Sequence, residues 1–198
     1  HESYGKICLE YVFEVENLPL GPIFLAAERP EINTYCINGT RLYNYDRNDF
    51  YIDECFQKML IPVGTLKQGK NIVTVEFELT YTSNVEALYI IGDFGVKVDG
   101  NVPCICELPN KIGTQNYSCY HMPFYTGDMT YLIPTSDIAS KMNIDEGERI
   151  TISAPDFKGP AIRIAASGET KSIVWEPFET DVTDAVISGE TVKLTVVG

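Results

Sequence analysis

The sequence lacks long hydrophobic runs, is poor in histidine and carries few basic residues, and each shortage excludes a class of protein. No apolar stretch approaches the roughly 18 residues of a membrane-spanning helix, and no basic segment followed by an apolar one opens the chain. A net charge of -13, with 15 basic against 28 acidic side chains, argues against nucleic acid and anionic lipid as partners. We expect a soluble protein that binds neutral or cationic ligands or another protein, although acidity also serves solubility alone.

The six cysteines and two histidines do not form a metal-binding pattern. There is no C-x-x-C pair, the spacing of Cys104–Cys106 is too tight for an ordinary zinc knuckle, and only His1 and His121 could complete a site. Cys8 and Cys36 lie in apolar strand patterns, where a buried free thiol acts as a small hydrophobic side chain. We therefore expect reduced cysteines.

Strand patterns occupy most of the chain, which is organised around Gly69–Val98. Apolar residues alternate with Thr and Glu in its first half, and Leu88–Val96 is a continuous apolar run closed by glycines, as in a fully buried strand. Asn38-Gly39 is the strongest hairpin signal because both residues tolerate a positive φ. A helical period of 3.6 residues is not evident, and only residues 136–142 could form a turn or two of helix.

The two halves of the chain echo each other. Asn38-Gly39 precedes an aromatic segment, Gly69 and a closing strand, and Ser167-Gly168 likewise precedes aromatic residues, Gly189 and a closing strand. Between the halves the composition changes to Gly, Pro, Asn and Cys. We predict an all-β protein with two β-sandwich units and little helix. The predicted parts are a unit at 1–98, a linker or edge ribbon at 99–116, and a second unit at 117–198.

The order of these motifs resembles the galactose-binding-like jelly roll, the sugar-binding domain of glycoside hydrolase family 2 and related large bacterial glycosidases. The first copy matches through Asn38-Gly39 and Lys67-Gln68-Gly69-Lys70-Asn71. The second matches through Asp181-Val182-Thr183-Asp184-Ala185-Val186 and Gly189, but has Ser167 and Thr191 where the pattern has asparagine. Two more stretches, Leu88–Val96 and Pro123–Gly127, look like parts of the C-terminal β-modules of rhamnosidase-like enzymes.

Each residue type of the motif has a structural role in a turn. Asn-Gly forms a tight hairpin, Asp and Thr side chains cap a turn by accepting bonds from backbone N–H groups, and the glycine reverses the chain into the last strand. The resemblance implies two jelly-roll β-sandwich units and allows a structural calcium ion, with no other cofactor. It further implies a fragment of a larger bacterial enzyme, cytoplasmic or secreted.

The function that the resemblance implies is a non-catalytic accessory region of a glycoside hydrolase. It would pack on the catalytic domain of the parent enzyme and contribute to carbohydrate binding. Two alternatives stay open at this point: an autonomous carbohydrate-binding module, and a small independent glycoside hydrolase.

Catalytic residues are not expected. A glycosidase needs two carboxyl groups, one of them with a raised pKa, whereas the paired carboxyl groups here lie in turn-like, solvated segments. These pairs are Asp53 with Glu54, Asp145 with Glu146, and Asp181 with Asp184. No Ser or Cys has the local context of a known nucleophile.

Carbohydrate binding requires exposed aromatic faces beside side chains that hydrogen-bond hydroxyl groups, and two aromatic segments have this composition. The candidates are Tyr45, Arg47, Tyr51 and Asp53 in the first segment, and His121, Tyr125 and Trp175 in the second. The competing interpretation is that these rings fill the rim of a β-sandwich core.

Overall fold

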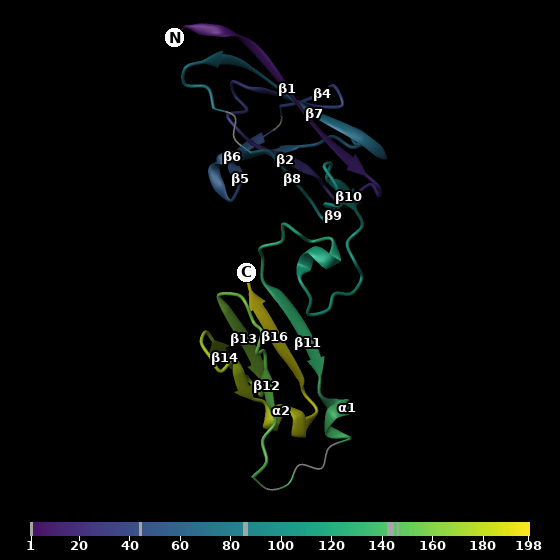
Figure 1. Ribbon diagram of the computed structural model, residues 1–198, viewed down its shortest axis with the longest axis vertical. Coiled ribbons are helices and arrows are strands. Elements are labelled where there is room, and N and C mark those ends of the chain that lie inside the picture. Colours follow the sequence, from purple (N-terminus) through teal and green to yellow (C-terminus); the bar gives the residue numbers. More distant parts are fainter. Residues whose placement is uncertain (1, 44, 85–86, 142–144, 146) are drawn as a thin grey trace. The chain divides into compact units, whose positions relative to one another are not determined.

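The computed structural model describes residues 2–43, 45–84, 87–141, 145 and 147–198 (Figure 1). Most of its ordered elements are strands, so the prediction of a mostly β protein with little helix is confirmed. The chain divides into two compact units, His1–Tyr125 and Thr126–Gly198. None of the described helices is long and apolar enough to span a bilayer.

Unit 1 contains two sheets and a short 3-10 helix, η1 (Tyr117–Tyr120). The strands of the larger sheet are β1 (Ser3–Val15), β3 (Thr34–Ile37), β4 (Thr40–Leu42), β7 (Gly69–Thr80), β9 (Gly95–Lys97) and β10 (Cys104–Cys106). Those of the smaller sheet are β2 (Phe24–Glu28), β5 (Tyr45–Tyr51), β6 (Asp53–Leu60) and β8 (Tyr89–Ile91). The spatial orders are β4-β3-β7-β1-β10-β9 and β5-β6-β2-β8.

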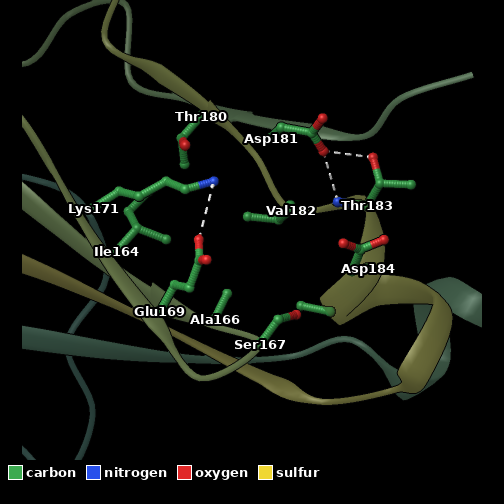
Figure 2. A pocket seen from close by; sticks show the side chains of 11 residues that line it. Ile164, Ala166, Ser167, Glu169, Lys171, Thr180, Asp181, Val182, Thr183 and Asp184 are labelled. Atoms are coloured by element: carbon green, nitrogen blue, oxygen red, sulfur yellow. Dashed lines mark hydrogen bonds and ion pairs between the residues drawn. The ribbon is translucent and has the colours of Figure 1, made fainter.

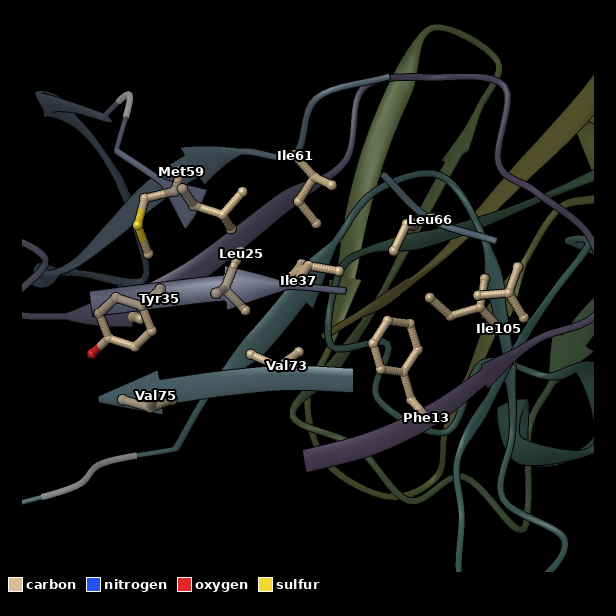
Figure 3. Packing of buried hydrophobic residues seen from close by; sticks show 13 residues of the cluster. Phe13, Leu25, Tyr35, Ile37, Met59, Ile61, Leu66, Val73, Val75 and Ile105 are labelled. Carbon is tan, nitrogen blue, oxygen red and sulfur yellow. The ribbon is translucent and has the colours of Figure 1, made fainter. Parts of the chain in front are cut away.

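Buried side chains from both sheets meet in one hydrophobic cluster (Figure 3). Val73 and Val75 of β7 are at most 3% exposed, as are Leu25 of β2 and Met59 of β6. The alternation predicted for the first half of Gly69–Val98 is thus confirmed, because every second residue of β7 faces this core. Burying each such side chain contributes roughly 1.5–3 kcal/mol.

The two longest strands of unit 1 form its central pair. β1 and β7 are antiparallel from Ser3 opposite Thr80 to Val15 opposite Gly69. β10 lies in the segment 99–116 and pairs with the end of β1 in the parallel direction, so the larger sheet is mixed. Beyond β10, β9 forms the edge of the sheet.

The prediction of one fully buried strand over Leu88–Val96 is wrong. A bend at residues 92–94 divides the run into β8, which pairs with β2 in the smaller sheet, and β9, which pairs with β10 in the larger one. Tyr89 of β8 is 37% exposed. The apolar run therefore crosses from one sheet to the other instead of filling the core as a single strand.

Unit 2 is a smaller arrangement of strands and two short helices. Its four-stranded sheet is ordered β11-β16-β13-β14, with a separate pair β12-β15. The elements are β11 (Met129–Pro134), α1 (Ser136–Ala139), β12 (Thr151–Ser153), β13 (Ala161–Ala166), β14 (Glu169–Ile173), β15 (Glu179–Asp181), α2 (Thr183–Ser188) and β16 (Thr191–Val197).

The helices of unit 2 differ in how far the sequence predicts them. α1 lies within the predicted helical segment 136–142, of which residue 142 lies outside the described residues. α2 was not predicted. It forms because Ala185 and Val186 are buried against Ile162, Ile164 and other side chains of the second core cluster.

Candidate functional site

The Asp-x-Thr-Asp motif forms the turn between β15 and α2. Oδ1 of Asp181 accepts hydrogen bonds from the backbone N–H of Thr183 at 2.9 Å and from its hydroxyl at 2.6 Å. The hydroxyl oxygen of Thr183 in turn accepts a bond from the N–H of Ile150 at 2.9 Å. The prediction that the Asp side chain caps this turn is confirmed, whereas the Thr183 hydroxyl accepts its backbone bond from a residue 33 positions away and not from a nearby N–H group.

The hydrogen bonds to Asp181 also lower the pKa of its carboxyl group. The Thr183 hydroxyl, followed by the Thr183 backbone N–H, holds the pKa of Asp181 below its ordinary value because both bonds favour the ionised carboxylate. An acid catalyst needs the opposite shift. The lowered pKa therefore does not suit Asp181 to act as an acid catalyst, and its hydrogen bonds hold the turn in place.

The glycines of both motifs adopt the predicted left-handed conformation. Gly189 ends α2 with a φ of 70° and donates its N–H to Val186 at 3.0 Å. Asn38 and Gly39, with φ values of 51° and 81°, join β3 to β4 as the predicted hairpin. Each reversal thus uses a conformation that most side chains disfavour.

The asparagines of the first motif form a buried polar network that the sequence did not predict. Asn71 is 0% exposed. Its Oδ1 accepts bonds from Asn38 Nδ2 at 2.8 Å and from the Lys67 N–H at 2.9 Å. Its Nδ2 donates to the carbonyls of Lys67 at 2.7 Å and Gly69 at 2.8 Å. The network ties the β3–β4 hairpin to the loop before β7.

In unit 2 a carboxylate bonds to the turn between β13 and β14. Ser167, where the pattern has asparagine, keeps the left-handed φ of 51°, and its N–H donates to Glu190 Oε2 at 3.1 Å. The neighbouring Thr135 is 1% exposed and donates its hydroxyl to the carbonyl of Glu190 at 2.6 Å. The departure from the pattern at Ser167 therefore leaves the turn geometry intact.

A cavity of about 250 Å³ lies between the Asp181 turn and the β13–β14 hairpin (Figure 2). Lys171 and Glu169 of β14 line one side, with 3.9 Å between Nζ and Oε2, and Asp181 and Asp184 line the other. Three carboxylates against one ammonium make the lining acidic. Its described lining residues include no aromatic ring, so it offers hydroxyl-binding groups without a stacking face.

The first group of predicted carbohydrate-binding residues shares one hairpin, β5–β6. Arg47 and Asp53 are exposed, whereas Tyr45 and Tyr51 are half-buried. Tyr45 packs against the core of unit 1, and the ring of Tyr51 lies 5.4 Å from that of Tyr89. Part of each ring is therefore used in packing, as the competing interpretation requires.

Asp53 caps the start of β6. Its carboxylate accepts a hydrogen bond from the Cys55 N–H at 2.8 Å, which lowers the pKa of Asp53. A hydrogen bond between the Cys55 thiol and the same carboxylate, followed by the negative charge of Asp53, raises the pKa of Cys55, because both favour the protonated thiol. Asp53 thus has a structural partner of its own, and its carboxyl group does not suit an acid catalyst either.

The second group is divided between the two units. His121 and Tyr125 follow η1 in unit 1: the carbonyl of His121 accepts a bond from Val96 at 2.7 Å, and the ring of Tyr125 lies 6.0 Å from that of Tyr117. Trp175 belongs to unit 2. These residues were grouped because their segments have similar composition. Composition does not show to which unit a residue belongs.

Trp175 is the candidate with the most accessible ring, at 74% exposed. The residues that follow it, including Glu176, Phe178 and Glu179, line a second, open cavity of unit 2. Phe178 is fixed there by Phe157, with 5.4 Å between the ring centres. This places an exposed aromatic face in the chain directly before two cavity-lining carboxylates.

The described histidines, cysteines and carboxylates do not gather at one place as metal ligands would. Among the described residues, no group of three or more His, Cys, Asp or Glu side chains is placed to hold a metal ion. His1, and Glu146 of the carboxylate pair with Asp145, lie outside those residues. All six cysteines are free thiols, but Cys8 is exposed, so the prediction that it is buried is wrong. The even-numbered side chains of β1 face solvent instead of the core.

No family model matches this chain, and no curated protein or solved structure gives a significant match to it.

Proposed function

We propose that the chain is a non-catalytic accessory region of a bacterial glycoside hydrolase, built from two galactose-binding-like jelly-roll units. The observation that supports this most strongly is the structural use of the motif side chains. Asn71 is fully buried and hydrogen-bonded, and Asp181 caps a turn through Thr183. Residues that are committed to turns in this way identify a type of fold and leave the chemistry to another part of the enzyme.

Two carboxyl groups with lowered pKa values are consistent with this role. The pKa values of Asp53 and Asp181 are both lowered by hydrogen bonds to their charged forms. Glycoside hydrolysis needs one carboxyl group that keeps its proton near neutral pH. We infer that catalytic carboxyl groups belong to a separate domain, and that this domain is the partner of the chain.

Two measurements test the accessory role. The coding sequence on either side of the chain should continue in frame into a glycosidase catalytic domain. The chain alone should hydrolyse no aryl glycoside, and Asp181→Asn should leave that result unchanged. Hydrolysis by the chain that is lost in Asp181→Asn or Asp184→Asn would show an independent enzyme and refute the proposal.

Carbohydrate binding is the second candidate function, and the exposure of Trp175 favours it. A residue that is 74% exposed can stack its ring on the C–H face of a sugar, and the carboxylates of Glu176 and Glu179, which line the cavity that follows in the chain, can accept bonds from hydroxyl groups. Ring stacking of this kind is an established mode of recognition by aromatic side chains, and a tryptophan offers the largest face.

A glycan array followed by calorimetry tests this function. If the wild-type chain binds a glycan on the array, Trp175→Ala should abolish that binding in calorimetry. Tyr81→Ala removes a ring that is 92% exposed in unit 1 and should leave binding unchanged. If the chain binds no glycan, or if both variants bind equally well, the Trp175 surface serves packing on the catalytic domain instead.

A further inference from the structure

Strand β1 has one open edge. Along one side it pairs with β7 over its whole length, whereas along the other it pairs with β10 only at Glu14 and Val15. Within the part of the chain that the structure describes, no strand covers that side between Gly5 and Phe13. Figure 1 shows β1 entering the sheet beside β7 from the N-terminus. An uncovered strand edge is a template for a further strand.

The even-numbered residues of β1 direct their backbone groups toward this edge. The N–H groups of Glu14 and Glu16 donate to carbonyls of residues 103 and 105 at 2.9 and 2.8 Å, on the side of β10. Backbone groups alternate between the two sides of a strand, and the pairing with β7 has no register shift from Gly5 to Val15. The residues with backbone groups at the open edge are therefore Lys6, Cys8, Glu10 and Val12.

We propose that a second copy of this chain occupies this edge, with the two β1 strands antiparallel about a two-fold axis at Cys8. In this register the numbers of two opposed residues, one from each copy, add up to 16. Lys6 then faces the partner's Glu10, and Glu10 faces the partner's Lys6. Ile7 faces the partner's Leu9, and Gly5 lies opposite the partner's Tyr11.

Side-chain chemistry selects this register. Opposite charges and apolar pairs directly across an antiparallel pair stabilise it, and an aromatic ring opposite a glycine covers the exposed backbone. A shift of two residues in either direction places Lys6 and Glu10 opposite uncharged side chains. A shift of four brings Lys6 against Lys6, or Glu10 against Glu10. Lys6 would ordinarily protect an edge strand from pairing, but here the partner's Glu10 neutralises it.

The ends of the edge limit the pairing to about seven residues. At one end β10 occupies the edge from Glu14 onward, and at the other a bulge between Ser3 and Gly5 turns the start of β1 out of register. Ile7 and Leu9 are half-buried and Tyr11 is 41% exposed, so a second copy would cover apolar surface that is open in the single chain. An interface of this length is smaller than that of a permanent dimer, so the association is weak and concentration-dependent.

Sedimentation equilibrium from about 10 μM to about 1 mM tests the proposal, a range that spans weak association. Lys6→Glu and Glu10→Lys should each raise the dimer dissociation constant by about tenfold or more, because each converts two attractive pairs into repulsive ones. An equimolar mixture of the two variants should dimerise again, since every charged pair is then opposite in sign. Lys6 and Glu10 are about 13 Å apart along one strand, so rescue cannot arise within one chain.

Two controls make the outcome decisive. Lys193→Glu makes the same change in net charge as Lys6→Glu, at an exposed strand position of unit 2, and should leave association unchanged. Circular dichroism of each variant establishes that it is folded. A wild-type chain that stays monomeric throughout, or a dimer that is insensitive to both charge reversals, would overturn the proposal. If the chain stays monomeric but a different polypeptide protects the β1 amides from hydrogen exchange, the edge belongs to that partner. This result would also overturn the proposal.

Cys8 reports the register directly. Opposed residues of a hydrogen-bonded antiparallel pair have Cα atoms about 5.5 Å apart, which a disulfide can bridge. Oxidised glutathione takes up two electrons and two protons from the two thiols, so the dimer should become covalent through Cys8. Cys8→Ser should abolish the link, and Cys55→Ser, at another exposed thiol, should not. Links formed mainly through Cys55 or Cys119 would contradict the register.

Discussion

Replacing Asn71 by alanine should destabilise unit 1 more than any ordinary polar substitution. The side chain is 0% exposed and makes four hydrogen bonds, to Asn38, to the N–H and carbonyl of Lys67, and to the carbonyl of Gly69. Each bond contributes about 1 kcal/mol net, and buried partners that lose it remain unsatisfied. We therefore expect a loss of about 3–4 kcal/mol, a large share of the roughly 5–15 kcal/mol that stabilises a typical domain.

Urea denaturation monitored by circular dichroism measures this loss, and hydrogen exchange assigns it to a unit. Peptides from β3 and β7 should exchange faster in Asn71→Ala, while peptides from unit 2 should not change. Asn116→Ala is the matched control, because its side chain accepts one bond, from Ser118 at 2.9 Å, at an exposed position. It should cost about 1 kcal/mol or less.

A double-mutant cycle with Asn38→Gly separates the pair from its surroundings. Glycine keeps the left-handed φ of 51° at this position and removes only the side chain. The coupling energy between positions 38 and 71 should lie in the range of roughly 0.5–3 kcal/mol that is found for residues in one network. A loss below about 1 kcal/mol for Asn71→Ala, or additive effects of the two substitutions, would refute this account of the network.

Three further predictions concern the core, the turns and pH. Leu25→Ala, at 0% exposed, should cost about 2–5 kcal/mol in denaturation experiments, whereas Leu60→Ala, at 46% exposed, should cost far less. Gly189→Ala should cost about 1–2 kcal/mol through backbone strain at its φ of 70°, measured by thermal unfolding, since a Cβ there meets no atom closer than 3.9 Å. Because the pKa of Asp181 is lower in the folded than in the unfolded state, its contribution is complete above the unfolded pKa and is lost as pH falls through the folded one. The acid dependence of unit 2 unfolding should therefore be shallower in Asp181→Asn; identical pH profiles would contradict this.

Local chemistry was the most predictable part of the molecule. Asn38-Gly39, the Asp181–Thr183 cap and Gly189 were all predicted from residue type, because each conformation depends on bonds or φ values within a few residues. The burial of Asn71 was not predicted, because it depends on a contact with Asn38 across 33 positions of sequence. The only signal in the sequence was the motif asparagine two positions after Gly69.

Long-range pairing accounts for two of the errors, and the limits of local patterns account for two more. The parallel pairing of β10 with β1 and the division of Leu88–Val96 between two sheets depend on strand order, which alternation does not encode. α2 is six residues long, too short for a 3.6-residue period to be recognised. The alternation around Cys8 correctly predicts a strand but not the face on which the thiol lies, because a period of two residues defines two faces and does not say which of them is buried.

The most direct test of the accessory role uses the native protein. Antibodies raised against the chain should capture, from the source cells, a polypeptide substantially longer than 198 residues that hydrolyses aryl glycosides. The accessory role predicts both properties in the same polypeptide. A captured protein no longer than this chain, or a longer one without glycosidase activity toward a broad panel of substrates, would contradict it.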